Sequence, residues 1–211
     1  MGLNMGVRTA MRKLLASQLG NPRGPMGKML AKRLNKFNHA ATSGAVEALA
    51  VVDDEVVADL GFGGGVGLRL LLDTQAVEVH GVDYSPTMVE RARREFTDDR
   101  LRLHTGSITA LPLPDDSVDG LITLNTIYFI EELSTAFGEI GRILRPDGRA
   151  VIGIGDPVAM AKMPVTQHGF LVRPVAEVVE TLERAGLVLT AHRRVSESDL
   201  SPHLLVVGHA K

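Results

Sequence analysis

The chain has 211 residues, of which 45% are hydrophobic, and a formal net charge of -2 at pH 7. This length and composition fit one globular domain with a substantial buried core. The absence of cysteine excludes disulfides and thiolate metal sites, and the seven histidines are scattered without metal-ligand spacing, so no metal is expected. No stretch approaches the roughly 18 uninterrupted apolar residues of a membrane span, so a cytoplasmic protein is expected.

The charge is unevenly distributed along the chain. Residues 1–40 contain eight lysines and arginines and no acidic residue, whereas the remainder is acidic. Such a basic arm fits a solvated lid that neutralises the acidic body, and it also fits peripheral contact with an anionic membrane surface. Nucleic-acid binding is not expected, because the arm has a single aromatic residue and the rest of the chain is acidic.

Three helical stretches are predicted in the first 51 residues. Two lie at 11–19 and 26–37 and are separated by turn-forming glycines and prolines. Ser43 has the character of an N-cap, which predicts a third, short helix over 45–51.

The strongest local pattern is VVADLGFGGGVG at 56–67. A short β-branched run breaks into glycines at alternate positions and an apolar helical pattern follows, which predicts a strand, a tight turn and a helix. Glycines let backbone N–H groups approach a ligand closely, and the helix N-terminus adds favourable partial charge, so a nucleotide-like ligand is predicted. The dinucleotide pattern G-x-G-x-x-G, counted from Gly61, fails at Val66, which disfavours a nicotinamide oxidoreductase.

From residue 56 onwards, apolar strand patterns alternate with helical spacings, as in βαβ units with a parallel sheet. Strands are predicted at 56–60, 77–83, 101–105, 118–124, 149–154, 187–194 and 203–210, and helices near 66–73, 86–96, 132–144 and 175–185. The last two strands are joined by too few residues for a crossover helix, so they are expected to form an antiparallel hairpin.

The ordered motifs of this region resemble the class I S-adenosylmethionine (SAM) dependent methyltransferases, in particular the bacterial small-molecule group of methyltransferase type 11. The resemblance rests on DLGFGGG at 59–65, GVDYS at 81–85, GSI at 106–108, LPLP at 111–114 and RILRPDG at 142–148. It implies an α/β, Rossmann-like fold with a seven-stranded, mostly parallel sheet, an antiparallel C-terminal hairpin and helices on both faces. Residues 1–50 would form an N-terminal helical lid and residues 51–211 the SAM-binding core of one structural domain.

The resemblance also implies where SAM would bind. Asp83 ends the second predicted strand, where a carboxylate can accept both ribose hydroxyls, as in dinucleotide folds. Relatives usually carry an acid after the glycine of the GSI motif, and here Ser107 takes that position, leaving its hydroxyl and the Ile108 backbone for the adenine. Tyr84 and Met88 are placed to flank the adenine, although a methionine at this spacing also fits the core. The predicted cofactor-binding residues are Asp59, Gly61, Phe62, Gly63, Gly65, Asp83, Tyr84, Met88, Ser107, Ile108, Asn125 and Thr126.

The implied reaction is in-line transfer of the methyl group to a small-molecule or lipid-headgroup acceptor, leaving S-adenosylhomocysteine. Positioning supplies much of the acceleration, and a base is needed only where the acceptor must lose a proton. Candidate bases are His168, Tyr128 and His39. A SAM-binding protein with a structural or sensing role is the alternative, and the choice between O-, N- and C-methylation is open, as is the oligomeric state. The basic arm is expected to fold over the SAM pocket and form one wall of the acceptor site.

Overall fold

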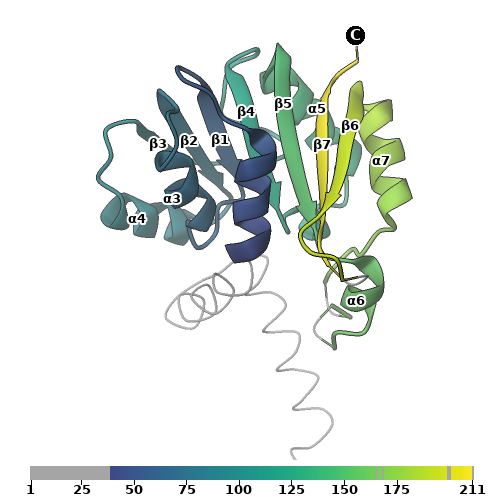
Figure 1. The fold of residues 1–211 in the computed structure, drawn as a ribbon. Coiled ribbons are helices and arrows are strands. Elements are labelled where there is room, and N and C mark those ends of the chain that lie inside the picture. The colour runs from purple at the N-terminus through teal and green to yellow at the C-terminus, as the bar shows by residue number, and fades with distance from the viewer. Residues whose placement is uncertain (1–38, 165, 168, 199–200, 211) are drawn as a thin grey trace, which may run out of the picture.

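The computed structural model describes residues 39–164, 166–167, 169–198 and 201–210 (Figure 1). They form a seven-stranded sheet in the order β3-β2-β1-β4-β5-β7-β6. The strands are β1 (Val56–Leu60), β2 (Glu78–Asp83), β3 (Leu101–Thr105), β4 (Val118–Leu124), β5 (Leu144–Ile154), β6 (Leu187–Arg194) and β7 (His203–His209). The first five strands are parallel, and β7 pairs antiparallel with both β5 and β6. The predicted mostly parallel sheet with a C-terminal hairpin is confirmed.

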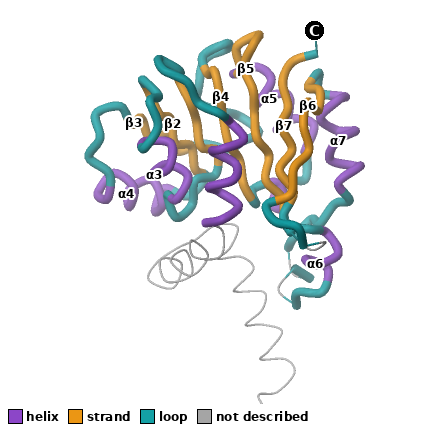
Figure 2. Tube along the Cα trace, viewed as in Figure 1, coloured by secondary structure: helices purple, strands orange, loops and turns teal. Residues whose placement is uncertain are grey.

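Helices cover both faces of this sheet, as Figure 2 shows in purple. They are α3 (Val66–Leu72), α4 (Pro86–Glu95), the 3-10 turn η1 (Ile127–Phe129), α5 (Leu133–Ile143), α6 (Pro157–Ala161) and α7 (Val175–Arg184). Helix 39–49 lies with α3 and α4 on one face, and α5 and α7 lie on the other (Figure 1). None of the helices in the described ranges is long and apolar enough to cross a membrane.

The central strands are apolar on both sides because both faces are covered. Ile152 of β5 belongs to the core cluster under α5 and α7, whereas its neighbour Val151 belongs to the cluster under helix 39–49, α3 and α4. Leu205 and Leu204 of β7 divide between the two clusters in the same way. This follows from the two-residue period of a strand and explains why these segments are continuous apolar runs.

Several element boundaries differ from the predictions. Helix 39–49 already includes Ser43, which therefore caps nothing; its hydroxyl donates to Glu47 Oε1 at 3.4 Å. Strand β5 begins at Leu144 rather than residue 149, with a register shift against β4 near Val118. The short helix α6 and the turn η1 were not predicted, and both are shorter than a sequence pattern can define. The expected helices at 11–19 and 26–37 lie outside the described residues.

Candidate functional site

The glycine turn between β1 and α3 has the backbone geometry that its sequence predicts. Gly61, Gly63 and Gly65 have φ values of 76°, 47° and 80°, in the left-handed region that favours glycine. The Gly61 N–H donates to Val82 O at 2.7 Å and so ties the turn to the end of β2. A Cβ on Gly61 would overlap the side chain of Thr126, so this position requires glycine for steric reasons as well.

Asp83, the last residue of β2, holds the same turn from its other side. Its Oδ2 accepts the Gly63 N–H at 2.7 Å and its Oδ1 accepts the Ser85 N–H at 2.8 Å. Burial raises the pKa of this carboxyl, and the two amide bonds partly offset that effect. Each carboxylate oxygen has a second lone pair, so Asp83 can hold the turn and still accept ligand hydroxyls.

Asp59 of β1 is buried behind the turn, with 4% of its surface exposed. It accepts a hydrogen bond from the backbone N–H of Leu68 in the first turn of α3, and a Cβ on Gly67 would overlap its carboxylate. Burial, reinforced by the negative charge of Asp83, raises the pKa of Asp59 to about 8. The turn therefore has two buried carboxylates and no described cationic side chain bonded to either of them.

The residues predicted to surround the adenine are divided between surface and core. Tyr84 is 65% exposed next to Asp83, whereas Met88 is fully buried in the core under α4, so its side chain offers no surface to a ligand here. The Ser107 hydroxyl bonds to Thr109 Oγ1 at 2.7 Å. Phe62 and Ile108 are also buried, at 5% and 6% exposure, so the structure brings Tyr84 and the Ser107 loop to the rim of the turn and leaves the others packed.

Beyond β4, Asn125 and Thr126 lie at the carboxyl edge of the sheet, beside the glycine turn. Asn125 has a φ of 57°, and its N–H donates to Gly153 O at 2.9 Å, joining the ends of β4 and β5. The Thr126 hydroxyl lies 3.3 Å from Leu60 O. Thr126 thus contacts the turn, and Asn125 follows β4 at the position where the strand order reverses, at which open α/β sheets bind ligands.

The three candidate bases have different outcomes. Tyr128 is 3% exposed, its hydroxyl accepts the Gly155 N–H, and burial raises its pKa. A buried phenol that holds its proton this tightly is a poor base, which argues against that role for Tyr128. His39 is exposed at the start of helix 39–49. His168 lies outside the described residues.

A chain of hydrogen bonds that runs from the buried Asp156 and His203 to the exposed His192 was not foreseen. His203 Nε2 lies 3.2 Å from Asp156 Oδ2, and His203 Nδ1 lies 2.8 Å from His192 Nε2. The Asp156 side chain also accepts the Ala159 N–H at 2.9 Å and so caps α6, and this bond is the main cause of its lowered pKa. The pairing of Ile154 with His203 brings Asp156 to His203, and the antiparallel pairing of β6 with β7 brings His192 to them. In the described ranges no group of three or more histidine or acidic side chains is placed to hold a metal ion.

The strand order 3-2-1-4-5 with an appended antiparallel hairpin defines a class I methyltransferase fold, and solved structures agree. A methyltransferase from Haloferax volcanii, solved with the Trm112 methyltransferase activator, superposes with a TM-score of 0.78 and 24% identity. The match covers 86% of this chain and 94% of that one. At this identity the likeness shows the fold alone.

Sequence comparison finds methyltransferases as well. Residues 58–152 match the family described as "Methyltransferase domain". An uncharacterised methyltransferase of Bacillus subtilis, YdaC, is 28% identical over 116 residues, which is 54% of this chain and 64% of that protein. The erythromycin 3''-O-methyltransferase of Saccharopolyspora erythraea is 31% identical over 132 residues, 60% of this chain and 42% of that protein. The matched regions span less than two thirds of each relative, and residues 58–152, a little under half of this chain, are similar to methyltransferase domains.

Proposed function

We propose that the protein transfers a methyl group from SAM to a small-molecule or lipid-headgroup acceptor, with SAM bound at the glycine turn. The observation that carries this proposal is the joint geometry of the turn and Asp83. Three glycines with positive φ shape the turn, the Cβ position of Gly63 is open, and the buried Asp83 carboxylate is fixed beside it by the amides of Gly63 and Ser85.

The residues at this edge fit the separate parts of SAM. Asp83 has lone pairs for the ribose hydroxyls, and Tyr84 presents an exposed ring beside it for the adenine. Asp59 and the backbone around Gly61 would serve the methionine end, where a bound ammonium group would favour the ionised form of the Asp59 carboxyl, whose pKa burial raises. When bound, SAM supplies an electrophilic methyl group on a sulfonium.

The chain would then accelerate the reaction by holding the acceptor in position against the methyl group of SAM. Asn125 and the neighbouring end of β5 lie where an acceptor must approach the glycine turn, and effective transfer needs the two reacting atoms held a little over ~3 Å apart and in line. The structure favours no strong base in the described part of the site, because Tyr128 is buried with a raised pKa. An acceptor that is already nucleophilic when it binds, or one activated by His39 or His168, fits this arrangement best.

The test uses methyl-labelled SAM, the purified protein and a whole-cell extract of its source, followed by partition between lipid and aqueous phases. Enzyme-dependent label in either phase, lost with Asp83→Ala, is the expected result. The phase that carries the label tells a lipid headgroup from a soluble acceptor. SAM binding without transfer to any extract component would contradict the proposed activity and favour a structural or sensing role.

A further inference from the structure

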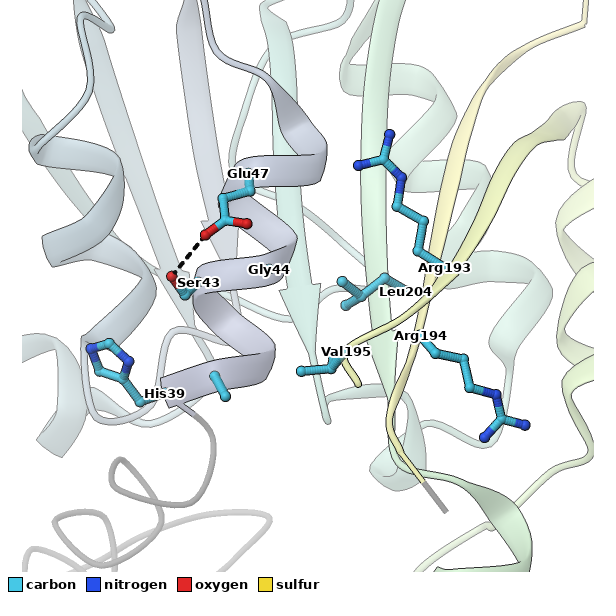
Figure 3. Close-up of a pocket in the computed structure, with 9 residues that line it drawn as sticks. His39, Ser43, Gly44, Glu47, Arg193, Arg194, Val195 and Leu204 are labelled. Atoms are coloured by element: carbon cyan, nitrogen blue, oxygen red, sulfur yellow. Dashed lines mark hydrogen bonds between the residues drawn. The ribbon is translucent and has the colours of Figure 1, made fainter. Parts of the chain in front are cut away.

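A groove separates helix 39–49 from the β6–β7 hairpin, on the face of the sheet that also carries α3 and α4 (Figure 3). Its volume of about 400 Å³ is in the range of small-molecule sites. Gly44 allows the helix to approach the hairpin closely, since a Cβ there would lie 3.3 Å from Leu204 Cδ1. Both walls therefore belong to packed secondary structure, which makes the groove a fixed feature of the fold.

The groove opens at the edge of the sheet where the proposed acceptor would bind. Leu204, on its floor, pairs with Gly153 near the carboxyl end of β5, and Gly153 O accepts the N–H of Asn125 at the end of β4. The carboxyl ends of parallel strands share one edge, and β7 is three strands from β1, so the groove lies three strands beyond the glycine turn along that edge. A molecule whose reactive atom faces the turn can extend into the groove.

The charges on the two walls differ. Arg193 is exposed on the hairpin wall and forms no ion pair with any described residue. Its neighbour Arg194 turns toward Asp156, with 3.6 Å between the guanidinium and Oδ2. Glu47 on the helix wall accepts the Ser43 hydroxyl, and His39 begins that wall with its ring turned to the outer side of the helix (Figure 3).

The sequence before the groove adds no compensating anion. Residues 1–38 contain eight lysines and arginines and no aspartate or glutamate. Whatever their positions, they therefore supply no carboxylate side chain that could neutralise Arg193. A guanidinium that has no ion-pair partner among the described residues, on the wall of a partly apolar groove, can bind phosphate or carboxylate by paired N–H donors.

We propose that this groove binds an anionic group, a phosphate or diphosphate, carried by the methyl acceptor, with Arg193 as its main contact. The proposal rests on the proposed methyltransferase function and adds to it the chemical class of the acceptor. Val195 would contact the apolar part next to the anion, and Glu47 on the opposite wall would oppose negative charge in the groove. The phosphate can belong to a free small molecule or to a lipid headgroup.

The experiment measures binding of inorganic pyrophosphate to the full chain by calorimetry, with SAM binding measured separately on each variant. Arg193→Gln is expected to weaken pyrophosphate binding about tenfold or more, because it removes charge-assisted hydrogen bonds. Glu47→Gln is expected to strengthen binding, because it removes a repulsive charge. Arg184→Gln is the matched control, since Arg184 is an exposed arginine on α7 that bonds only within its own helix among the described residues.

A parallel measurement with vesicles of phosphatidylglycerol and of phosphatidylcholine distinguishes the sources. Binding to the anionic vesicles that falls with Arg193→Gln assigns the groove to a lipid headgroup, and pyrophosphate binding alone assigns it to a soluble phosphate. Pyrophosphate and vesicle binding that are both unaffected by Arg193→Gln, or that fall equally with Arg184→Gln, would overturn the proposal, because the anions would then bind elsewhere. Unchanged SAM binding in Arg193→Gln separates this outcome from a failure of the proposed cofactor site.

Discussion

Position 61 requires glycine for two independent reasons. Its φ of 76° lies where a residue with a side chain is strained, and a Cβ would overlap Thr126. Thr126 is itself held by the carbonyl of Leu60, so it has little freedom to move away. The turn is thus stabilised by close contact between two loops, one after β1 and one after β4.

We expect Gly61→Ala to lower the free energy of unfolding by about 2 kcal/mol or more, because both the strain and the overlap oppose it. The comparison is Gly138→Ala in α5, where no atom lies within 4 Å of the new Cβ. That change is expected to raise stability by about 0.5–1 kcal/mol through helix propensity. Urea unfolding of both variants measures the difference, and equal effects would contradict the role given to Gly61.

Asp59 predicts a pH dependence of stability. Its folded-state pKa of about 8 lies above the ordinary value of 3.8, so the folded chain retains a proton that the unfolded chain releases. The stabilisation from this proton is complete below pH ~4 and is lost as the pH rises towards ~8. Asp59→Asn should therefore become more stable than the wild type as the pH rises, by a few kcal/mol at most.

Thermal unfolding of wild type and Asp59→Asn at pH 6 and pH 9 measures this effect. Asp53→Asn, at an exposed carboxylate in the turn before β1, is the control. Parallel pH curves for wild type and Asp59→Asn would show that the buried carboxyl does not titrate in this interval.

The sequence predicted the positions of individual site residues, but it did not predict hydrogen bonds between residues that only the fold brings together. The position of Asp83 after β2 was predictable, but the engagement of both its oxygens with Gly63 and Ser85 was not, because the turn conformation decides it. The hydrogen-bonded chain from Asp156 through His203 to His192 left no local sequence signal at all.

At the level of elements, Arg149 joins helix 39–49 to the sheet. From β5 its guanidinium donates to the carbonyls of Leu49 and Ala50 at the helix end, and it pairs with Glu55 through contacts of 2.7 and 2.8 Å. The side-chain hydrogen bond from Arg149 is the main cause of the lowered pKa of Glu55. One side chain thus satisfies helix carbonyls and fixes the turn that leads into β1.

Replacing Arg149 with Met keeps the apolar stem and removes these bonds. We expect a loss of about 1–3 kcal/mol in unfolding free energy and faster amide exchange over residues 41–49, because the helix end and Glu55 lose their partner. Arg69→Met, which breaks a mostly exposed ion pair with Glu95, is the comparison and should change stability by less than about 1 kcal/mol. Unaltered exchange over 41–49 in Arg149→Met would contradict the anchoring role.

The boundaries of the elements were the weakest part of the sequence prediction. Ser43 has the chemistry of an N-cap, but the helix begins before it and the hydroxyl bonds to Glu47 instead, as serine can do inside a helix. Strand β5 starts five residues earlier than predicted, because Leu144 pairs with Val118 ahead of the register shift between the two strands.

At the scale of the whole molecule, the order of apolar runs was sufficient to predict the sheet. Segments with the hydrophobic pattern of strands alternate with segments that have the 3.6-residue hydrophobic period of helices. The short link between the last two strands allows only a hairpin. The groove between helix 39–49 and the β6–β7 hairpin was less predictable, because these elements meet through tertiary contacts that no motif marks.

If the basic arm acts as a lid, its removal should affect methyl transfer and SAM binding differently. A chain lacking residues 1–38 is expected to lose methyl transfer to a much greater extent than SAM binding, because the glycine turn and the residues bonded to it lie wholly within residues 59–126. Labelled transfer and SAM affinity, measured on the same preparation, provide the comparison. Loss of both to an equal extent would count against a lid.

The most direct test of the central claim is a crystal structure of the protein with S-adenosylhomocysteine. The account predicts the ribose against Asp83, the amino acid end beside Gly61 and Asp59, and the adenine next to Tyr84. Cofactor bound away from the glycine turn, or binding of NADH there with no affinity for S-adenosylhomocysteine, would contradict it.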